Sequence, residues 1–226
     1  DLSIVVTANE QMDYMKVGAK ALSLIHTEYE NKMFHITHGM MRFSRNISGK
    51  MSSRTGFIIT AEDLIKQLKE KTGNEKIAVG AIKHMILRQA IGGDIIFDLE
   101  KSVSTEGDSG VYLQYAHARA NSVLEKAKKE DILPDPHAYP PEIFEVEKLL
   151  YRFPEIVLRS ASEYEPHYIA NYLIEVARAY NNFYGNTVIV KKDDKTSSYK
   201  VALTFAFTFV IKKGLYLLGI EAPEKM

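Results

Sequence analysis

The amino-acid pattern changes between Ser102 and Gly110, and this change constrains the fold more than any other feature of the sequence. Before it, short β-branched runs alternate with segments of helical periodicity. After it, apolar residues recur almost throughout at the three- and four-residue spacing of amphipathic helices. The segment between is rich in Ser, Thr, Gly and acidic residues, as loops between domains are. The sequence therefore predicts one domain over residues 1–106 and a second over residues 107–226.

The first domain has the pattern of an α/β unit, in which strands alternate with helices. Asp1–Thr7 is short and β-branched, which predicts a buried strand. Thr60 and Asp63 have the spacing of an N-terminal capping box and predict the start of a helix. In order, we expect a strand over residues 1–7, a helix over 12–28, a strand over 34–38, helices over 61–71 and 76–90, and an extended segment over 94–99.

The second domain is predicted to be a helical bundle. Four prolines between residues 134 and 141 interrupt its helical pattern. Pro154 suits the first turn of a helix, and Gly185 suits a helix end. We expect helices over residues 111–130, 142–153, 154–164 and 166–184, and a last helix that ends near Leu218. The chain as a whole is therefore predicted to be mainly α.

Charge and cysteine content narrow the classes of function. Lys plus Arg and Asp plus Glu both number 29 among 226 residues, so contact with a nucleic acid requires a local basic patch. Cysteine is absent, which excludes disulfides and thiolate metal sites and agrees with a cytoplasmic protein. The longest apolar run, Val201–Ile211, is too short to span a bilayer, so we expect no membrane association.

The run Gly49–Gly56 has the composition of a phosphate-binding loop. Its glycines allow backbone amides to approach an anion closely, and its other residues supply donors: Lys50, Ser52, Ser53 and Arg54. Positioned cations act most strongly on a phosphate group that gains charge in a transition state. A solvated basic turn has the same composition, so the residue types alone leave both interpretations open.

Several blocks of the sequence resemble a known family. The order Lys-Met-Ser-Ser-Arg at residues 50–54 resembles the Lys-Met-Ser-Lys-Ser loop of class I aminoacyl-tRNA synthetases, which closes over ATP. Residues 107–119, 165–184 and 217–226 are similar, in the same order, to blocks of the arginyl-tRNA synthetase family. The resemblance covers essentially the whole chain. It implies a mainly α fold, namely the C-terminal remnant of a Rossmann-like α/β catalytic domain followed by an α-helical anticodon-binding bundle.

The resemblance implies roles for residues in and before the loop. Lys50, Ser52 and Ser53 match the catalytic positions that steady the ATP phosphates while the adenylate forms. Met41, Lys50 and Met51 match positions that contact ATP. These roles are consequences of the family resemblance and not of the loop's composition.

Two further features of the first domain have competing interpretations. Gln11 follows the first expected strand, where ligands of open α/β sheets bind, and the resemblance implies that it lines the arginine pocket. An ordinary polar turn residue is the alternative. His35 and His38 lack an evident third ligand, so we expect no protein-bound metal.

Tyr115 and Arg119 are four residues apart and so share one helix face. An aromatic ring beside a guanidinium suits stacking on, and hydrogen bonding to, an unstacked RNA base. The alternative is a half-buried tyrosine with Arg119 in a salt bridge nearby. The resemblance favours RNA and adds Tyr184 and Met226 to the anticodon-binding residues.

For a complete protein, the resemblance implies an arginine–tRNA ligase that acts through arginyl-adenylate. Its partners would be arginine tRNA, L-arginine and ATP, with Mg²⁺ carried by ATP, and we expect a monomer. The His-Ile-Gly-His-type motif of the family and most of its nucleotide-binding sheet would lie upstream of Asp1, in missing N-terminal parts of the same polypeptide. We therefore expect this chain alone to be inactive.

Two other functions remain open. One is a stand-alone, non-catalytic RNA-binding module, which an upstream reading frame containing the missing motif would exclude. The other is a class I synthetase of the cysteine or methionine type, which shares the Lys-Met-Ser loop and a helical anticodon domain. That type lacks the block Gln-Tyr-Ala-His-Ala-Arg at residues 114–119 and the terminal methionine.

Overall fold

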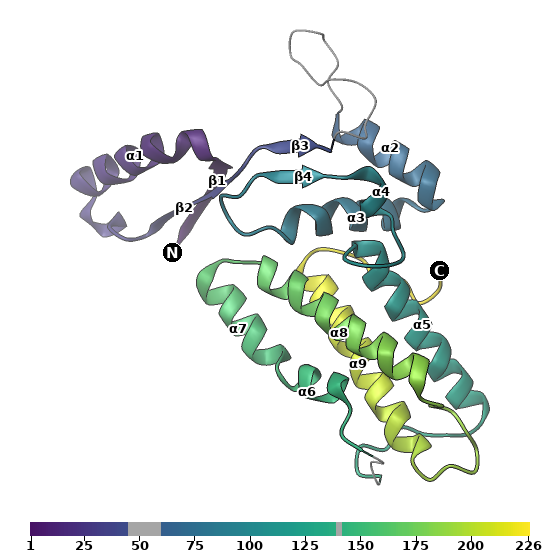
Figure 1. Ribbon diagram of the computed structural model, residues 1–226. Coiled ribbons are helices and arrows are strands. Elements are labelled where there is room, and N and C mark those ends of the chain that lie inside the picture. The colour runs from purple at the N-terminus through teal and green to yellow at the C-terminus, as the bar shows by residue number, and fades with distance from the viewer. Residues whose placement is uncertain (45–59, 139–141) are drawn as a thin grey trace. The chain divides into compact units, whose positions relative to one another are not determined.

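The computed structural model describes residues 1–44, 60–138 and 142–226, and these residues form nine α-helices and four strands (Figure 1). They divide into two compact units. The first contains the described residues of 1–48 together with residues 89–98, and the second contains those of 49–88 and 99–226. The prediction of a mainly α fold is confirmed.

The first unit contains two parallel strand pairs. Strand β1 (Ser3–Ala8) pairs with β2 (Met33–His38), with Ser3 opposite Met33. Parallel neighbours require a crossover, which α1 (Met12–Ile25) provides together with two short 3₁₀ helices, η1 (Asn9–Gln11) and η2 (Thr27–Tyr29). Strand β3 (Met41–Phe43) pairs in parallel with β4 (Ile95–Phe97). Both strands and the helix that we expect between residues 1 and 38 are thus present.

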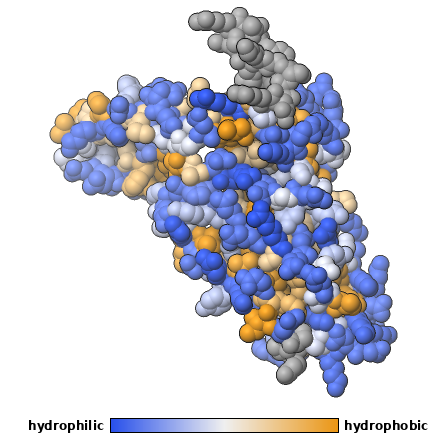
Figure 2. Space-filling model, in the orientation of Figure 1, coloured by the Kyte–Doolittle hydropathy of each residue, from blue (hydrophilic) through white to orange (hydrophobic). Residues whose placement is uncertain are grey.

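The prediction that the first strand is buried is wrong for this chain. Ile4 and Val6 of β1 are 44% and 60% exposed. Within the described residues β1 has one neighbouring strand, and α1 packs against η2 and β2, so no second layer covers the faces of β1. Hydrophobic residues are correspondingly visible at the surface around α1 (Figure 2).

The second unit is helical. Its elements in order are α2 (Ala61–Thr72), α3 (Glu75–Leu87), α4 (Leu99–Ser102), α5 (Gly110–Lys129), α6 (Glu145–Tyr151), α7 (Phe153–Glu163), α8 (His167–Asn186) and α9 (Ser197–Leu217). Helices α5, α8 and α9 run side by side and enclose the main core (Figure 1). In that core the ring of Tyr180 stacks on Phe207 at a centroid distance of 3.8 Å.

Local chemistry explains where these helices begin. The Thr60 hydroxyl accepts from the Asp63 amide while the Asp63 side chain accepts from the Thr60 amide, which confirms the predicted capping box. The Ser109 hydroxyl caps α5 by accepting from the Tyr112 amide at 2.9 Å. Pro154 lies in the first turn of α7, where its missing N–H costs no helical hydrogen bond.

The prediction that Gly185 ends the fourth bundle helix is wrong. Helix α8 continues through Gly185 to Asn186, and Thr187 is the first extended residue. Gly185 is not among the glycines with positive φ, so it does not adopt the left-handed conformation of a terminating glycine. The Asn186 side chain donates to the Asn182 carbonyl at 3.0 Å and satisfies an acceptor of the last turn.

The boundary between residues 106 and 107 stays a prediction. Helices α2 and α3 belong to the same compact unit as the bundle, because α3 packs against α5. Sequence composition marks the loop at this boundary but does not indicate which helices pack together across it. Within the described residues, no helix is both long and apolar enough to cross a membrane.

Helices α3 and α5 approach each other through glycine. A Cβ atom built on Gly110 would lie 2.6 Å from the Gly80 carbonyl oxygen and 2.9 Å from Cβ of His84. Because one obstacle is backbone, we expect Gly110→Ala to destabilise the second unit by about 1–3 kcal/mol, as overpacking of a core does. Urea denaturation followed by circular dichroism measures this change.

Gly185→Ala is the matched control, since a Cβ there has nothing within 4 Å. A helical alanine loses less entropy on folding than glycine, so this variant should be stabilised, by up to about 1 kcal/mol. Equal stability changes for the two variants would refute the close approach of α3 and α5.

His84 on α3 is fully buried, and neither of its ring nitrogens has a hydrogen-bond partner among the described residues. Burial, aided by the nearby charge of Arg88, lowers the pKa of His84 to about 4. The folded state therefore binds fewer protons than the unfolded state. Above about pH 6.5 the titration of His84 should not reduce the free energy of unfolding. As the pH decreases towards 4 the free energy of unfolding should fall, by about 2 kcal/mol at pH 5.

The difference between the wild type and His84→Leu isolates this contribution from the titration of carboxylates. We expect the free energy of unfolding of the wild type to fall more steeply than that of the variant between pH 6.5 and 4. Parallel curves for the two proteins in that range would show that His84 is not held in its neutral form.

Candidate nucleic-acid interface

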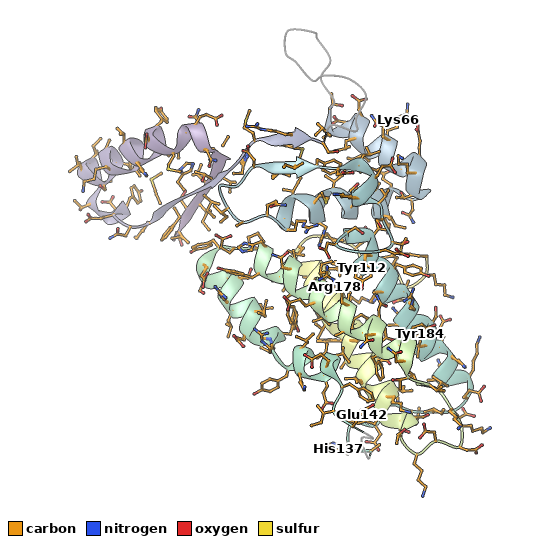
Figure 3. The ribbon with its side chains drawn as sticks, viewed as in Figure 1. Lys66, Tyr112, His137, Glu142, Arg178 and Tyr184 are labelled. Atoms are coloured by element: carbon orange, nitrogen blue, oxygen red, sulfur yellow. The ribbon has the colours of Figure 1, made fainter. Side chains whose placement is uncertain are left out.

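The four residues predicted to bind an anticodon lie together in the second unit. Tyr115 and Arg119 come from α5, Tyr184 comes from the last turn of α8 beside α5 (Figure 3), and Met226 comes from the segment after α9. All four line one groove with a volume of about 690 Å³. Residues more than 100 positions apart in the sequence thus converge on one surface.

Arg119 is the centre of this arrangement. Its guanidinium carbon lies 4.7 Å from the ring centroid of Tyr115 and 5.2 Å from that of Tyr184, so the cation contacts two aromatic faces. Its Nη1 donates to the side-chain oxygen of Asn181 at 3.0 Å, and the Asn181 amide donates to the Tyr112 hydroxyl at 2.8 Å. Packing and hydrogen bonding together fix the guanidinium.

The alternative interpretation of this helix face places Arg119 in a salt bridge. Within the part of the chain that the structure describes, Arg119 has the neutral Asn181 as its hydrogen-bond partner and no carboxylate partner. Tyr115, Tyr184 and Met226 are 36%, 41% and 48% exposed. The rings and the thioether therefore offer accessible surface beside a cation whose charge is not neutralised.

The rim of the groove adds positive charge. Lys126 and Lys225 line it with Arg119, and among the described lining residues none is acidic. Lys225 also forms an ion pair with Glu125, at 3.4 Å. A chain with no net charge thus has a local cationic surface suited to a phosphate backbone.

One wall of the groove is the extended segment 187–190, which a buried lysine holds in place. Nζ of Lys200 donates to the Val188 carbonyl at 3.1 Å and to the Asp194 carboxylate at 2.8 Å. Lys200 is 7% exposed, so these bonds compensate the desolvation of its charge. Hydrogen bonds from Lys200, the larger cause, and from Thr196 stabilise the ionised carboxylate of Asp194 and hold its pKa well below its usual range.

The remaining predicted site residues lie elsewhere. Gln11 is an exposed residue of η1 after β1, and Met41 is in β3, opposite Ile95. Lys50, Met51, Ser52 and Ser53 lie outside the described residues. The roles of all six residues stay predictions. In the described ranges, no group of three His, Cys, Asp or Glu side chains is arranged to hold a metal ion.

Sequence reasoning missed several parts of the groove. Asn181 orients Arg119, and its position three residues before Tyr184 on the same helix face was the available signal. The wall at 187–190 carries no such signal, because its place depends on the fold of the preceding and following helices. Tyr180 and Phe183, which neighbour Tyr184 on α8, are buried in the core and do not line the groove.

Comparison with known proteins relates this groove to a family. The family model described as the DALR anticodon binding domain matches residues 113–226. The arginine–tRNA ligase of Lactiplantibacillus plantarum is 32% identical over 246 aligned residues, which cover 99% of this chain and 42% of that protein. The chain thus spans about two fifths of the length of this curated relative.

Solved structures show the same relationship. The arginyl-tRNA synthetase of Thermus thermophilus superimposes with a TM-score of 0.80 at 25% identity, over 100% of this chain and 41% of that one. A methionyl-tRNA synthetase of Mycobacterium tuberculosis, solved with methionyl-adenylate, reaches a TM-score of 0.59 at 16% identity, over 98% of this chain and 42% of that one, which shows a shared fold alone. The chain resembles arginyl-tRNA synthetases over its whole length, and by the match to residues 113–226 it belongs to the DALR anticodon binding domain family.

Proposed function

We propose that this chain is the C-terminal part of an arginyl-tRNA synthetase and that its groove binds the anticodon of arginine tRNA. The observation that carries the proposal is the guanidinium of Arg119, held between Tyr115 and Tyr184 in a groove with no acidic lining among the described residues. Each base has a π-face for the tyrosines, and the guanidinium supplies donors to a base edge.

The charges around the groove suit the rest of an anticodon loop. A splayed-out base stacked on the accessible surface of one tyrosine would bring its flanking phosphates towards the rim, where Lys126 and Lys225 lie. Since these cations are few and the chain has no net charge, we expect modest salt dependence of binding. Base contacts then supply a large share of the affinity.

For the complete protein we propose ligation of L-arginine to its tRNA through arginyl-adenylate. ATP is the second substrate and carries Mg²⁺, Gln11 lines the arginine pocket, and Met41 contacts ATP. Missing N-terminal parts of the same polypeptide supply the rest of the active site. We further propose that this protein is a cytoplasmic monomer. The similarity to arginine–tRNA ligases supports these proposals.

Stem-loop titrations separate only one of the two rival functions from this proposal. A stand-alone RNA-binding module would bind the anticodon arm just as the proposed synthetase part does, and an upstream reading frame with a His-Ile-Gly-His-type motif would exclude it. A methionine- or cysteine-type synthetase would prefer the anticodon arm of the corresponding tRNA. The larger structural similarity to arginyl-tRNA synthetase favours arginine, with a TM-score of 0.80 against 0.59.

Tyr115→Ala tests the anticodon proposal in the 226-residue chain. Loss of one aromatic stacking surface is worth about 1–3 kcal/mol, so affinity for an arginine anticodon stem-loop should fall roughly 5- to 150-fold. A stem-loop changed only at the central anticodon base should bind weakly to both proteins. Fluorescence anisotropy titrations of both RNAs give the four affinities.

Two variants serve as controls for this titration. Tyr115→Phe retains the ring and should bind like the wild type. Tyr216→Ala removes a 74% exposed tyrosine of α9 outside the groove and should have no effect. If the wild type bound both stem-loops equally, the groove would not read the anticodon.

The proposed catalytic loop is tested by Lys50→Ala in the complete enzyme. A cation that acts on the transition state lowers the barrier more than it strengthens substrate binding. We expect arginine activation to slow by about 10²–10³-fold, while affinity for tRNA stays within twofold. ATP–pyrophosphate exchange measures the rate of arginine activation. An unchanged rate would mean that the loop is only a solvated basic turn.

A further inference from the structure

The segment after α9, residues 219–226, makes polar contacts with α5 and, through Lys76 and Lys83, with α3. We name it the C-terminal tail. The Gln114 side chain donates to the Glu221 carbonyl at 2.8 Å, and Nδ1 of His117 lies 2.8 Å from the Pro223 carbonyl. Increasing residue numbers in α5 meet increasing numbers in the tail, so over residues 221–223 the two run in the same direction beside each other.

The two α5 side chains that contact the tail are buried. Gln114 is fully buried and His117 is 1% exposed, although both are polar. A buried donor costs free energy unless it is hydrogen-bonded, and each of these side chains has a tail carbonyl as a partner. Gln114 Nε2 also lies 3.5 Å from the Lys76 carbonyl, and its Oε1 has no partner among the described residues. An apolar residue at either position would pack as well but would leave the extended tail without these bonds.

The geometry also determines the tautomer of His117. The Pro223 carbonyl only accepts, so Nδ1 must carry the proton and donate. The Asn121 side-chain amide donates to the His117 carbonyl at 3.0 Å and lies 3.3 Å from Nδ1 and 3.2 Å from Nε2. Burial lowers the pKa of His117, which agrees with a neutral ring. The Nδ1 proton thus has its acceptor when the tail is in place.

Helix α5 contacts the tail with one face and lines the groove with another. Gln114, His117 and Asn121 recur at helical spacing on the face that meets the tail. Tyr115 and Arg119 lie on the groove face, where the tail delivers Met226. The register of the tail on the first face therefore determines which tail residue reaches the second.

We propose that His117 and Gln114 are positioning residues for RNA recognition: they fix the register of the C-terminal tail so that Met226 completes the groove beside Tyr115 and Arg119. This inference rests on the proposed function. It assigns a role in specificity to two buried side chains that cannot themselves touch RNA.

A double-mutant cycle in the 226-residue chain tests the proposal. His117→Leu and Met226→Ala should each weaken binding of the matched anticodon stem-loop by about three- to tenfold. In the Met226→Ala background, His117→Leu should cause no further loss of affinity, because its effect passes through Met226. Additive losses, or no loss from His117→Leu, would overturn the proposal.

Two further variants separate positioning from folding. Asn places its amide nitrogen close to the site of Nδ1, so His117→Asn should keep the bond to Pro223 and bind like the wild type. If His117→Leu does not fold, Gln114→Met removes the bond to Glu221 with little change in volume and takes its place in the cycle. A variant that lost stability but kept full affinity would indicate a purely structural role.

A readout without RNA distinguishes failure of this inference from failure of the proposed function. The ε-methyl resonance of Met226, assigned by Met226→Ala, should shift and narrow in His117→Leu and stay unchanged in His117→Asn. An unchanged methyl resonance in His117→Leu would overturn the positioning role. If the wild type bound no stem-loop while the methyl still responded, the anticodon proposal would fall and tail positioning would remain.

Discussion

The close packing of α5 against α3 and α9 is the constraint on which the second unit depends. Gly110 allows α5 to begin in contact with the backbone of α3, and the apolar face of α5 then enters the core shared with α8 and α9. Helix α5 contributes to the core, to the groove and to the contacts with the tail. Its rotation about its own axis therefore determines which of its residues face each of these three. A rotation of one residue, about 100°, would turn both the tail face and the groove face away from their partners.

Much of the bundle could be predicted because its signals are local. The capping box at Thr60 and the proline of α7 are readable in the sequence, and helix periodicity gives most boundaries. The failures depend on distant structure. A glycine at position 185 suits a helix end, but α8 continues to Asn186. The exposure of β1 depends on whether another layer of structure covers it, which the local sequence does not determine. Of the site, the sequence predicts four lining residues, but not Asn181 or the wall at 187–190.

Electrostatics explains how a chain with no net charge can present the cationic groove that we propose as an RNA site. Opposite charges are paired over much of the surface of the second unit, as between Lys69 and Glu75 or between Lys76 and Glu221. At the groove, Arg119 is paired with a neutral amide instead of a carboxylate, and its charge remains available. The choice of Asn rather than an acid at position 181 therefore keeps the guanidinium oriented without neutralising it.

The convergence of α5, the end of α8 and Met226 has a consequence for biosynthesis. A ribosome releases the residues of α5 long before it releases residue 226, so the nascent chain presents an incomplete groove for the whole of that interval. Under the proposed function, RNA binding therefore requires that residues 219–226 have emerged and docked on α5. Products that stop before residue 219 would retain most of the bundle but lack Met226 in the groove, and under the proposed function they would bind RNA weakly.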